Sequence, residues 1–502
     1  MNVVQRLGSD ITMDDFYCGG GGETTGAKKL GINVRHAFNH WSVAIETHNA
    51  NHPETTHIQA DIGTYDPYAY KPSIMAWFSP ECKTFSMGLG KSQTPQRQMM
   101  LPGMRFEEYD LTPQQERSRV TAGDILRHVE AHRYRRFVVE NVVGFRLWEK
   151  FDDWLKVLIN FGYDYRIVYL NSMFCHPTPQ SRDRMYTCFW LKGDKAPDLD
   201  IYPKAYCEKC GRDVDAVQTR KPTSAVPYMT YGAQYTYNCP TCASIIEPYY
   251  YASANIIDWT NVGTRIGDRK KPLAPKTMER IEKGFKRYIE NPPTPRRAAL
   301  YHGHVPRAFI SPYHHDTADR SRSVYEELPT VDGSPRFGLV MLTSTNRMNE
   351  RSRAVDEPFP TQTGGHNMGL TFAPMITSVN YFSERERAVD EPMPTQTTSI
   401  KSGLTLMPFV SSYNGQSVYT TPDQAISTMT GTARHALVAP QSPHVEDCYF
   451  RMFTVDEVKQ AMGFPSDYIL LGTQRDQVEL AGQAVTPDAA RVLLSRMVES
   501  LA

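Results

Sequence analysis

The protein has 502 residues, which corresponds to about three domains at about 150 residues each. Hydrophobic residues make up 40% and charged residues 22%, as in proteins with large packed cores. Lys+Arg and Asp+Glu both number 55, which excludes a histone-like polycation and an acidic tail protein but not a nucleic-acid enzyme, because a neutral total can hide a basic face.

No apolar run reaches the roughly 18 residues of a membrane span, and the first residues lack the apolar core of a signal peptide. Nine cysteines are too few for a disulfide scaffold. Four of them form two Cys-x2-Cys pairs, a pattern typical of metal binding in a reducing compartment. We therefore expect a soluble intracellular protein with no membrane partner.

The first 190 residues alternate strand-like and helix-like segments. Short apolar runs occur at 32–38, 74–78 and 137–139. Helical patterns lie near 41–51, 118–132 and 145–160. This alternation predicts βαβ units and a parallel sheet covered on both faces. Ligand sites in such sheets lie at the carboxyl ends of the strands, and the motifs described next follow these runs.

Two motifs of the N-terminal part are candidates for ligand binding and nucleophilic attack. A glycine-rich turn, Gly19 to Gly22, could bring backbone amides close to a ligand, although a plain flexible turn is about as well supported. Cys82 lies in a polar loop beside Lys83, which would favour a reactive thiolate. The alternative for Cys82 is an inert core cysteine.

Polar residues also end the third apolar run and form a cluster at 180–184. Glu140 is a candidate acid or base because burial raises a carboxyl pKa, and a plain strand-end glutamate is the alternative. Alternate spacing puts Arg182 and Arg184 on one side of an extended chain, where two guanidinium groups suit a phosphate or a base edge. A surface ion-pair ladder is the alternative reading.

The cysteine pairs give the strongest metal signal in the sequence. Cys207-x2-Cys210 and Cys239-x2-Cys242 are separated by 28 residues. Four thiolates from two such knuckles suit a closed tetrahedral zinc site of structural type. The alternative is four free thiols that are spaced by chance.

Beyond the cysteine pairs, the pattern becomes basic and then repetitive. Residues 265–287 form a basic helical pattern, either phosphate-binding or simply a solvated face. Residues 310–438 repeat with a period of 31 to 34 residues and predict stacked strand–turn units. The aligned repeats are 323–332, 354–363, 388–397 and 421–430. The final 60 residues return to a helical pattern.

The order of these motifs resembles that of the DNA cytosine-5 methyltransferases across nearly the whole chain. Residues 15–22 resemble the family's Asp-Leu-Phe-x-Gly-x-Gly-Gly turn, and 79–86 (SPECKTFS) its Pro-Cys nucleophile loop. Further matches are NHW at 39–41, Asp61, Glu-Asn-Val at 140–142, Gln-x-Arg-x-Arg at 180–184, and the last two motifs at 451–465 and 482–487.

The resemblance implies an α/β fold: a Rossmann-like, S-adenosylmethionine-dependent methyltransferase domain with a large β-rich, zinc-containing target-recognition region. The catalytic domain would comprise 1–192, completed by 448–502. A zinc-ribbon-like insertion and the basic segment would occupy 193–300, and the repeat-containing target-recognition region would occupy 301–447.

The resemblance also implies a reaction and roles for named residues. Cys82 would attack C6 of a flipped-out cytosine while Glu140 binds N3, with Arg182 and Arg184 completing the catalytic set. Gln180, Arg182, Arg269, Lys270 and Lys271 would contact DNA. The residues expected to bind the methyl donor, S-adenosylmethionine, are Tyr17, Gly19, Gly21, Gly22, His40, Trp41, Asp61, Ile62, Gln483, Ala484 and Val485.

Some positions depart from the family pattern. His40 stands where the family has an acid, Glu81 replaces a proline, Lys83 a glutamine, and Gln483 an asparagine. We expect a monomer that methylates a specific sequence of double-stranded DNA in the cytoplasm of a bacterial cell or a phage-infected host. A cognate restriction endonuclease as partner stays an open question. So do two other functions, a tRNA cytosine-5 methyltransferase and a catalytically silent DNA-binding homologue.

Overall fold

The computed structural model describes residues 10–80, 113–301 and 446–501, together with short strands between 309 and 436. Positions 223, 262, 286–295 and 447 are exceptions within these ranges. The predicted nucleophile Cys82 lies outside the described residues. Within the described ranges, every helix is too short or too polar to cross a bilayer.

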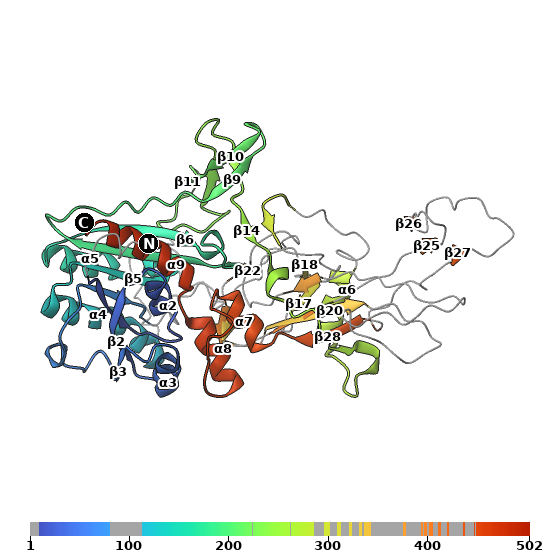
Figure 1. Ribbon diagram of the computed structural model, residues 1–502, viewed down its shortest axis with the longest axis horizontal. Coiled ribbons are helices and arrows are strands. Elements are labelled where there is room, and N and C mark those ends of the chain that lie inside the picture. The colour runs from blue at the N-terminus through green and yellow to red at the C-terminus, as the bar shows by residue number, and fades with distance from the viewer. Residues whose placement is uncertain are drawn as a thin grey trace, which may run out of the picture.

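A seven-stranded sheet organises the N-terminal part of the chain (Figure 1). Its strand order is β3-β2-β1-β4-β5-β8-β6. The strands are β1 (Thr12–Phe16), β2 (Asn33–Asn39), β3 (Thr56–Gln59), β4 (Met75–Phe78), β5 (Arg136–Val142), β6 (Tyr163–Asn171) and β8 (Asp183–Leu191). Neighbouring strands pair in parallel from β3 to β5, so the carboxyl ends of these five strands meet at one edge.

The predicted parallel sheet is confirmed from β3 to β5, but the whole sheet is mixed. β8 lies between β5 and β6 and is antiparallel to both. Only 11 residues, 172–182, connect β6 to β8. A parallel crossover needs a dozen or more residues, so this short connection returns the chain in the opposite direction.

Helices cover both faces of the sheet. β-strand alternation sends Ala76 and Phe78 to the face covered by α4 (Pro113–His132) and α5 (Phe151–Asn160), and Met75 and Trp77 to the opposite face. The opposite face is covered by α2 (Gly22–Lys28) and by α9 (Pro487–Glu499). α3 (Ser42–Asn51) contacts the outer strands β2 and β3. The helices predicted near 41–51 and 118–132 are therefore confirmed.

The predicted helix near 145–160 is confirmed only in its second half. A 3-10 turn occupies Val143–Leu147, and α5 starts at Phe151. Phe151, Trp154, Leu155 and Leu158 form the buried stripe of α5, which is the spacing of one helix face.

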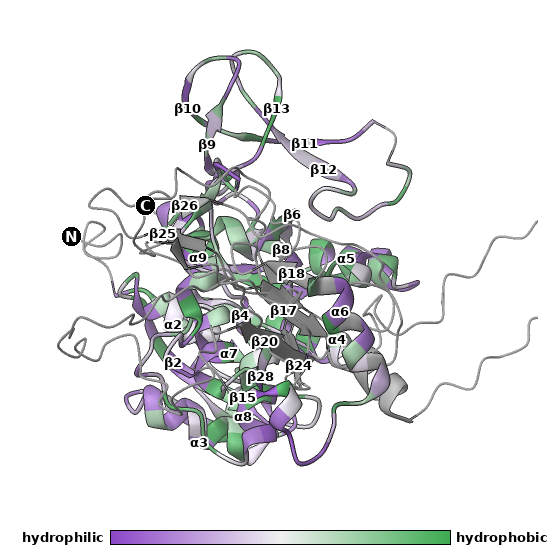
Figure 2. Ribbon diagram, turned by 90° about the vertical axis from the view of Figure 1, so that its right-hand side faces the viewer, coloured by the Kyte–Doolittle hydropathy of each residue, from purple (hydrophilic) through white to green (hydrophobic). Residues whose placement is uncertain are grey.

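A small cysteine-containing unit projects from the sheet (Figure 2). It contains the hairpin β9 (Lys204–Cys207) and β10 (Arg212–Asp215), and the three strands β11 (Val217–Arg220), β12 (Tyr235–Asn238) and β13 (Ile245–Ile246). Its base is the parallel pair of β14 (Tyr250–Tyr251) and β16 (Ala299–Leu300).

A second sheet lies in the other half of the molecule (Figure 1). Its strand order is β15-β28-β20-β17-β18-β21, and β24 also pairs with β20. The strands are β15 (Thr264–Arg265), β17 (Phe309–Pro312), β18 (Ser321–Ser323), β20 (Arg336–Leu342), β21 (Met375–Thr377), β24 (Lys401–Leu404) and β28 (Cys448–Met452). β28 leads into α7 (Val455–Ala461) and α8 (Gln474–Gln483), which return the chain to the first sheet.

The basic pattern at 265–287 is a helix only from Pro275, where α6 (Pro275–Phe285) begins. Its predicted first part is instead β15 followed by a 3-10 turn, Ile266–Asp268. Pro272 and Pro275 explain the difference, because proline is excluded from a helix interior but accepted at the first helical position.

Most of the predicted strand–turn repeats lie outside the described residues, so their stacking stays a prediction, and only short strands within them can be compared. A Ser-x-Asn pattern recurs in the repeats at 344–346, 378–380 and 412–414. The strands β20, β21 and β25 (Val410–Ser412) each end just before this pattern or at its serine, so equivalent positions of the repeats form strands. However, β21 pairs with β18, and β25 belongs to a separate sheet with β26 (Tyr419–Thr420) and β27 (His435–Ala436). Among the strands that the structure describes, none of these three equivalents pairs with another.

The segment from α8 to α9 closes the N-terminal part by packing against the glycine turn. A Cβ at Gly20 would lie 2.7 Å from the carbonyl oxygen of Leu480, and a Cβ at Gly22 would overlap with that of Val485. Figure 1 shows the red α9 beside the blue α2. Glycine is therefore required here because two backbones touch, whatever the turn also binds.

We predict that Gly22→Ala destabilises the protein by about 3 kcal/mol or more, because its methyl group must displace the backbone at Val485. The matched control is Gly123→Ala in α4, where nothing lies within 4 Å of the added Cβ and helix propensity favours alanine. Thermal unfolding of both variants tests this. Equal melting temperatures for Gly22→Ala and wild type would contradict the packing argument.

Candidate active site and cysteine cluster

Acidic residues gather on one face of the sheet at the carboxyl ends of its central strands. Asp15 at the end of β1 and Glu140 near the end of β5 point to the face that α2 covers, and Glu23 of α2 approaches from above. All three are buried, with exposures of 0%, 7% and 1%. Because their burial costs solvation, these carboxyls need neutralisation by a cation or by a proton.

Glu140 is neutralised by arginine. Its Oε1 lies 2.9 Å from Nε of Arg184, on the neighbouring strand β8, and both residues are buried. Burial nevertheless raises the pKa of Glu140 above its usual value, while the charges of Arg184 and Arg182 oppose the rise. The surface-ladder alternative for the two arginines is thus wrong, since both are buried beside Glu140.

Arg182 has a second task that the sequence did not suggest. Its guanidinium donates to the carbonyl oxygens of Gly482 and Ala484, both at 3.0 Å. It therefore ties the end of α8 to the sheet face that carries Glu140. The direct ion-pair partner of Glu140 is Arg184, and Arg182 acts on Glu140 through its charge.

Two neighbours fix the strand that carries these arginines. Asn171 accepts the backbone N–H of Arg182 at 3.0 Å and donates to Ser181 Oγ at 3.0 Å, a role that sequence reasoning missed. The backbone of Gln180, in β7 (Gln180–Ser181), pairs in parallel with Met393 in β22 (Met393–Pro394). Gln180 is fully buried, so its predicted role in DNA contact would need exposure that this structure does not give it.

The chain that leads to Cys82 is anchored beside Glu140. Asn141, next to Glu140, donates from Nδ2 to the carbonyl oxygen of Pro80 at 3.3 Å. Cys82 follows Pro80 by two residues, and two residues span at most about 7 Å. Covalent geometry thus limits how far Cys82 can lie from this anchor, although Cys82 itself is outside the described residues.

Asp15 ends a directed chain of hydrogen bonds. Its Oδ2 accepts from Thr24 Oγ1 at 2.7 Å, so Thr24 must in turn accept from His48 Nε2 at 3.0 Å. His48 Nδ1 is then the acceptor for His57 Nε2 at 2.8 Å. Burial lowers the pKa of His48 well below its usual value and raises the pKa of Asp15 to about 7. The histidines of this chain are therefore neutral near pH 7.

Eight of the eleven residues predicted to bind the methyl donor fall into two groups. Tyr17, Gly19, Asp61 and Ile62 lie at the ends of β1 and β3, where Asp61 is exposed and Ile62 buried. Gly22, Ala484 and Val485 are close-packed at the contact between the glycine turn and the segment after α8, whereas Gly21 packs against Tyr468 and His48. The residues of this second group are buried.

Three other predicted donor contacts lie at the edges of this region. His40 is exposed just after β2, and Trp41 is half-buried, with its backbone N–H held by Asn39 Oδ1 at 2.9 Å. Gln483 is exposed and donates to Glu479 Oε1 at 2.8 Å. These side chains therefore lie at or near the surface and apart from the buried acids Asp15, Glu23 and Glu140.

The predicted DNA contacts Arg269, Lys270 and Lys271 precede α6. Both lysines are exposed at this turn. Arg269 has its guanidinium 5.6 Å from the centroid of the Phe450 ring and donates to the Phe450 carbonyl at 3.3 Å. The lysines therefore offer charge at the surface, while Arg269 mainly packs against β28.

The four cysteines of the two pairs converge. Their Sγ atoms all lie within 4.8 Å of one another, with Cys207 3.5 Å from Cys242 and Cys210 3.8 Å from Cys239. A tetrahedral zinc with bonds of about 2.3 Å places its sulfurs about 3.8 Å apart. The cluster thus has the size of a zinc site made of four cysteines.

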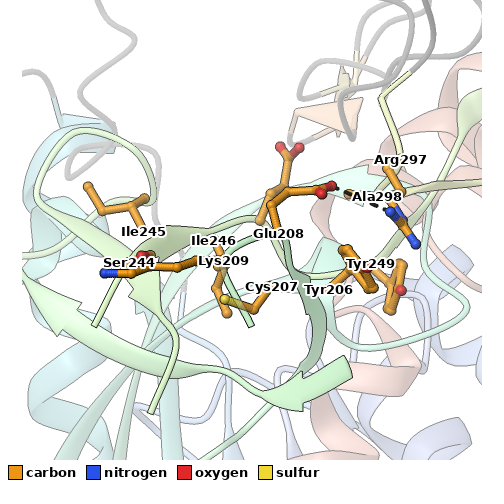
Figure 3. A pocket seen from close by; sticks show the side chains of 11 residues that line it. Tyr206, Cys207, Glu208, Lys209, Ser244, Ile245, Ile246, Tyr249, Arg297 and Ala298 are labelled. Carbon is orange, nitrogen blue, oxygen red and sulfur yellow. Dashed lines mark ion pairs between the residues drawn. The ribbon is translucent and has the colours of Figure 1, made fainter. Parts of the chain in front are cut away.

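A cavity of about 330 Å³ lies beside this cluster (Figure 3). Its wall includes Cys207, Ile246 and Tyr249, and the Arg297 guanidinium carbon lies 3.3 Å from the centroid of the Tyr206 ring. All its lining residues belong to the cysteine-containing unit or to 297–298, and none to the strand ends described above. It is therefore separate from the candidate active site.

Comparison with known proteins identifies the family. The profile of the C-5 cytosine-specific DNA methylase family matches residues 11–210 and 360–499, about two thirds of the chain. The chain belongs to this family. The match includes both the sheet with its acidic strand ends and the C-terminal helices that pack on it.

Two curated relatives are type II methyltransferases. M.DdeI of Desulfomicrobium norvegicum is 27% identical over 197 residues, which cover 37% of this chain and 42% of that protein. M.AgeI of Thalassovita gelatinovora is 25% identical over 139 residues, 26% of this chain and 27% of that protein. The chain thus matches less than half the length of either relative.

Solved structures also align with the chain. The Entamoeba histolytica methyltransferase EhMeth aligns over 98% of this chain and 99% of its own, with a TM-score of 0.45 and 11% identity. The Spodoptera frugiperda DNMT2 mutant aligns over 97% and 99%, with a TM-score of 0.43 and 14% identity.

We predict that Arg184→Gln destabilises the protein by about 3 kcal/mol, because it leaves a buried carboxylate without its partner. Loss of the cation raises the folded-state pKa of Glu140 further, so stability falls as pH rises through that pKa. The deficit should therefore be larger at about pH 8 than at about pH 5. Arg166→Gln, which breaks the exposed Arg166–Asp200 pair, is the control and should cost about 0.5 kcal/mol or less at both pH values. A pH-independent deficit would refute the assignment of Arg184.

Proposed function

We propose that the protein methylates C5 of cytosine in a specific sequence of double-stranded DNA, with S-adenosylmethionine as donor. The observation that carries this proposal is the buried Glu140–Arg184 pair, whose neighbour Asn141 holds the strand end that leads to Cys82. A nucleophile beside a carboxyl of raised pKa is the combination that activation of a cytosine ring requires. Family membership supports the same reaction.

The chain's own residues supply the covalent part of the mechanism. The Cys82 thiolate attacks C6 while Glu140, whose raised pKa favours its protonated form, donates a hydrogen bond or a proton to N3. The electron pair from the C5–C6 bond then becomes available at C5. After methylation, C5 loses its proton and Cys82 is eliminated, which restores the double bond. Arg184 holds Glu140 in place throughout.

The strand ends fit the proposed donor. Asp61 offers an exposed carboxylate, and at Gly19 the nearest atom to an added Cβ is the Tyr17 carbonyl oxygen, 3.7 Å away, so the backbone is open to a ligand. S-adenosylmethionine supplies an electrophilic methyl group when it is bound. Tyr17, Trp41 and Ile62 would complete its surroundings, with His40 in place of the family's acid.

The target base must leave the DNA stack, because C5 and C6 are inaccessible inside a duplex, at a cost of about a few kcal/mol. We propose that 1–192 and 448–502 form the catalytic domain, and that 193–300 and 301–447 bind the DNA around the flipped base. Lys270 and Lys271 are the best-placed phosphate contacts because they stand at the surface turn before α6. We further propose a cytoplasmic monomer, and the type II relatives favour pairing with a cognate endonuclease.

The cysteine cluster is proposed to hold structural zinc. The sulfur separations fit a tetrahedral site, and four cysteines leave no position for a catalytic water. The cluster is attached near the catalytic strands through His176, whose Nε2 lies 2.6 Å from the Tyr249 carbonyl oxygen. Zinc would thus hold the projecting unit in shape next to Gln180.

We expect new 5-methylcytosine in host DNA when the wild-type protein is expressed, and none with Cys82→Ser, because serine is a far weaker nucleophile. Mass spectrometry of nucleosides measures both. Cys82→Ser should still bind duplex DNA, which serves as the control for folding. Methylated tRNA in place of DNA would support the tRNA alternative, and full activity in Cys82→Ser would refute the mechanism.

We expect about one zinc ion per chain in the purified protein and its loss in Cys239→Ser, because a structural site needs all four thiolates. Elemental analysis with thermal unfolding measures the metal and its effect. Cys188→Ser, at a buried cysteine in β8 outside the cluster, is the control and should keep zinc. Wild-type protein without zinc would show that the cluster is only four thiols.

A further inference from the structure

Glu23 is a buried acid that the proposed mechanism does not use. It lies in the first turn of α2 with 1% of its surface exposed, and it faces Asp15 and Glu140. In the part of the chain that the structure describes, no lysine or arginine pairs with it, and its Oε2 has no hydrogen-bond partner. Burial of an acid in this way is costly and calls for a compensating role.

The contact of Glu23 is with the end of β4. Its Oε1 accepts a hydrogen bond of 2.6 Å from Ser79 Oγ, which in turn accepts from Trp77 Nε1 at 2.9 Å. The backbone N–H of Ser79 donates to the carbonyl oxygen of Phe16 at 3.2 Å. Ser79 is therefore held from α2, from its own strand and from β1.

Ser79 is three residues before Cys82. The next residue, Pro80, is held on the other side by Asn141, the neighbour of Glu140. The two residues after β4 thus form a junction that is held from two sides. Glu23 holds Ser79, and Asn141, the neighbour of Glu140, holds Pro80. Since reactive groups must be held close to their productive geometry, a displacement of about 1 Å at such a junction can cost about a hundredfold in rate.

We propose that Glu23 is a positioning residue for the nucleophile: through Ser79 it fixes the end of β4 from which the chain continues to Cys82. This inference rests on the proposed function. The hydrogen bond from Ser79 needs an acceptor at Oε1 of Glu23. Because this carboxyl is buried without a cation, a proton on its other oxygen, Oε2, keeps it neutral. Burial and the charge of Asp15 both raise the pKa of Glu23, which is consistent with that neutral form. Glutamine has the same shape and charge as the neutral acid.

The test compares Glu23→Ala, Glu23→Gln and Ser79→Ala in the full-length protein. The readout is the rate of covalent adduct formation with 5-fluorocytosine DNA in the presence of S-adenosylmethionine. Glu23→Ala and Ser79→Ala should each slow the adduct about ten- to a hundredfold with KM for the donor nearly unchanged. Glu23→Gln should retain nearly the wild-type rate, and the double alanine variant should be no slower than the slower single variant.

A full rate in Glu23→Ala, or a loss in Glu23→Gln as large as in Glu23→Ala, would overturn the proposal. If Glu23→Ala fails to fold, Ser79→Ala alone decides, because it removes the same bond from the other side. Glu130→Ala, at an exposed glutamate of α4, is the matched control.

Hydrogen exchange separates this inference from the proposed function. The Ser79 amide should exchange faster in Glu23→Ala than in wild type or Glu23→Gln, whether or not the enzyme acts on cytosine. Failure of the wild type to form any adduct would refute the proposed function, while unchanged exchange at Ser79 would refute the positioning role of Glu23.

Discussion

The close backbone contact of the glycine turn with the end of α8 and the residues that follow it is the constraint on which the rest of the structure depends. Without side chains at Gly20 and Gly22, the carbonyl groups of Leu480 and Val485 lie directly against the turn. Arg182 then receives two of its hydrogen-bond acceptors from the same segment. The buried surroundings of Glu140 are thus built from parts of the chain about 300 residues apart.

Neutralisation differs among the three acids at the strand ends, and this difference gives each a distinct chemistry. Glu140 has two arginine charges near it and still has a raised pKa, so it can both hold its position and release a proton. Asp15 receives hydrogen bonds through Thr24 from neutral histidines. The contact of Glu23 is a serine hydroxyl. Similar side chains therefore serve different purposes because their partners differ.

The sequence predicted the central strands, the helices α3 and α4, and the convergence of the four cysteines, because apolar runs and paired cysteines are local patterns. The predicted parallel sheet holds only as far as β5, because the short 172–182 connection reverses the chain. The helical pattern predicted from 265 begins only at Pro275, because proline is accepted at a helix start and not in its interior. The partners of Arg182 and the burial of Glu23 could not be read from the sequence, since both depend on contacts between distant segments. The only sequence feature that pointed to the role of Glu23 was its position directly after the glycine turn.

The docking of α9 on α2 also determines when this enzyme can mature. Lys29 and Asp488, which pair across the contact, are 459 positions apart. On the ribosome the first strands therefore emerge long before the helix that covers one face of their sheet. Until then, apolar residues such as Met13, Met75 and Val138 lack their cover and are exposed to chaperones or to other nascent chains. This face of the sheet is therefore complete only after α9 has been synthesised.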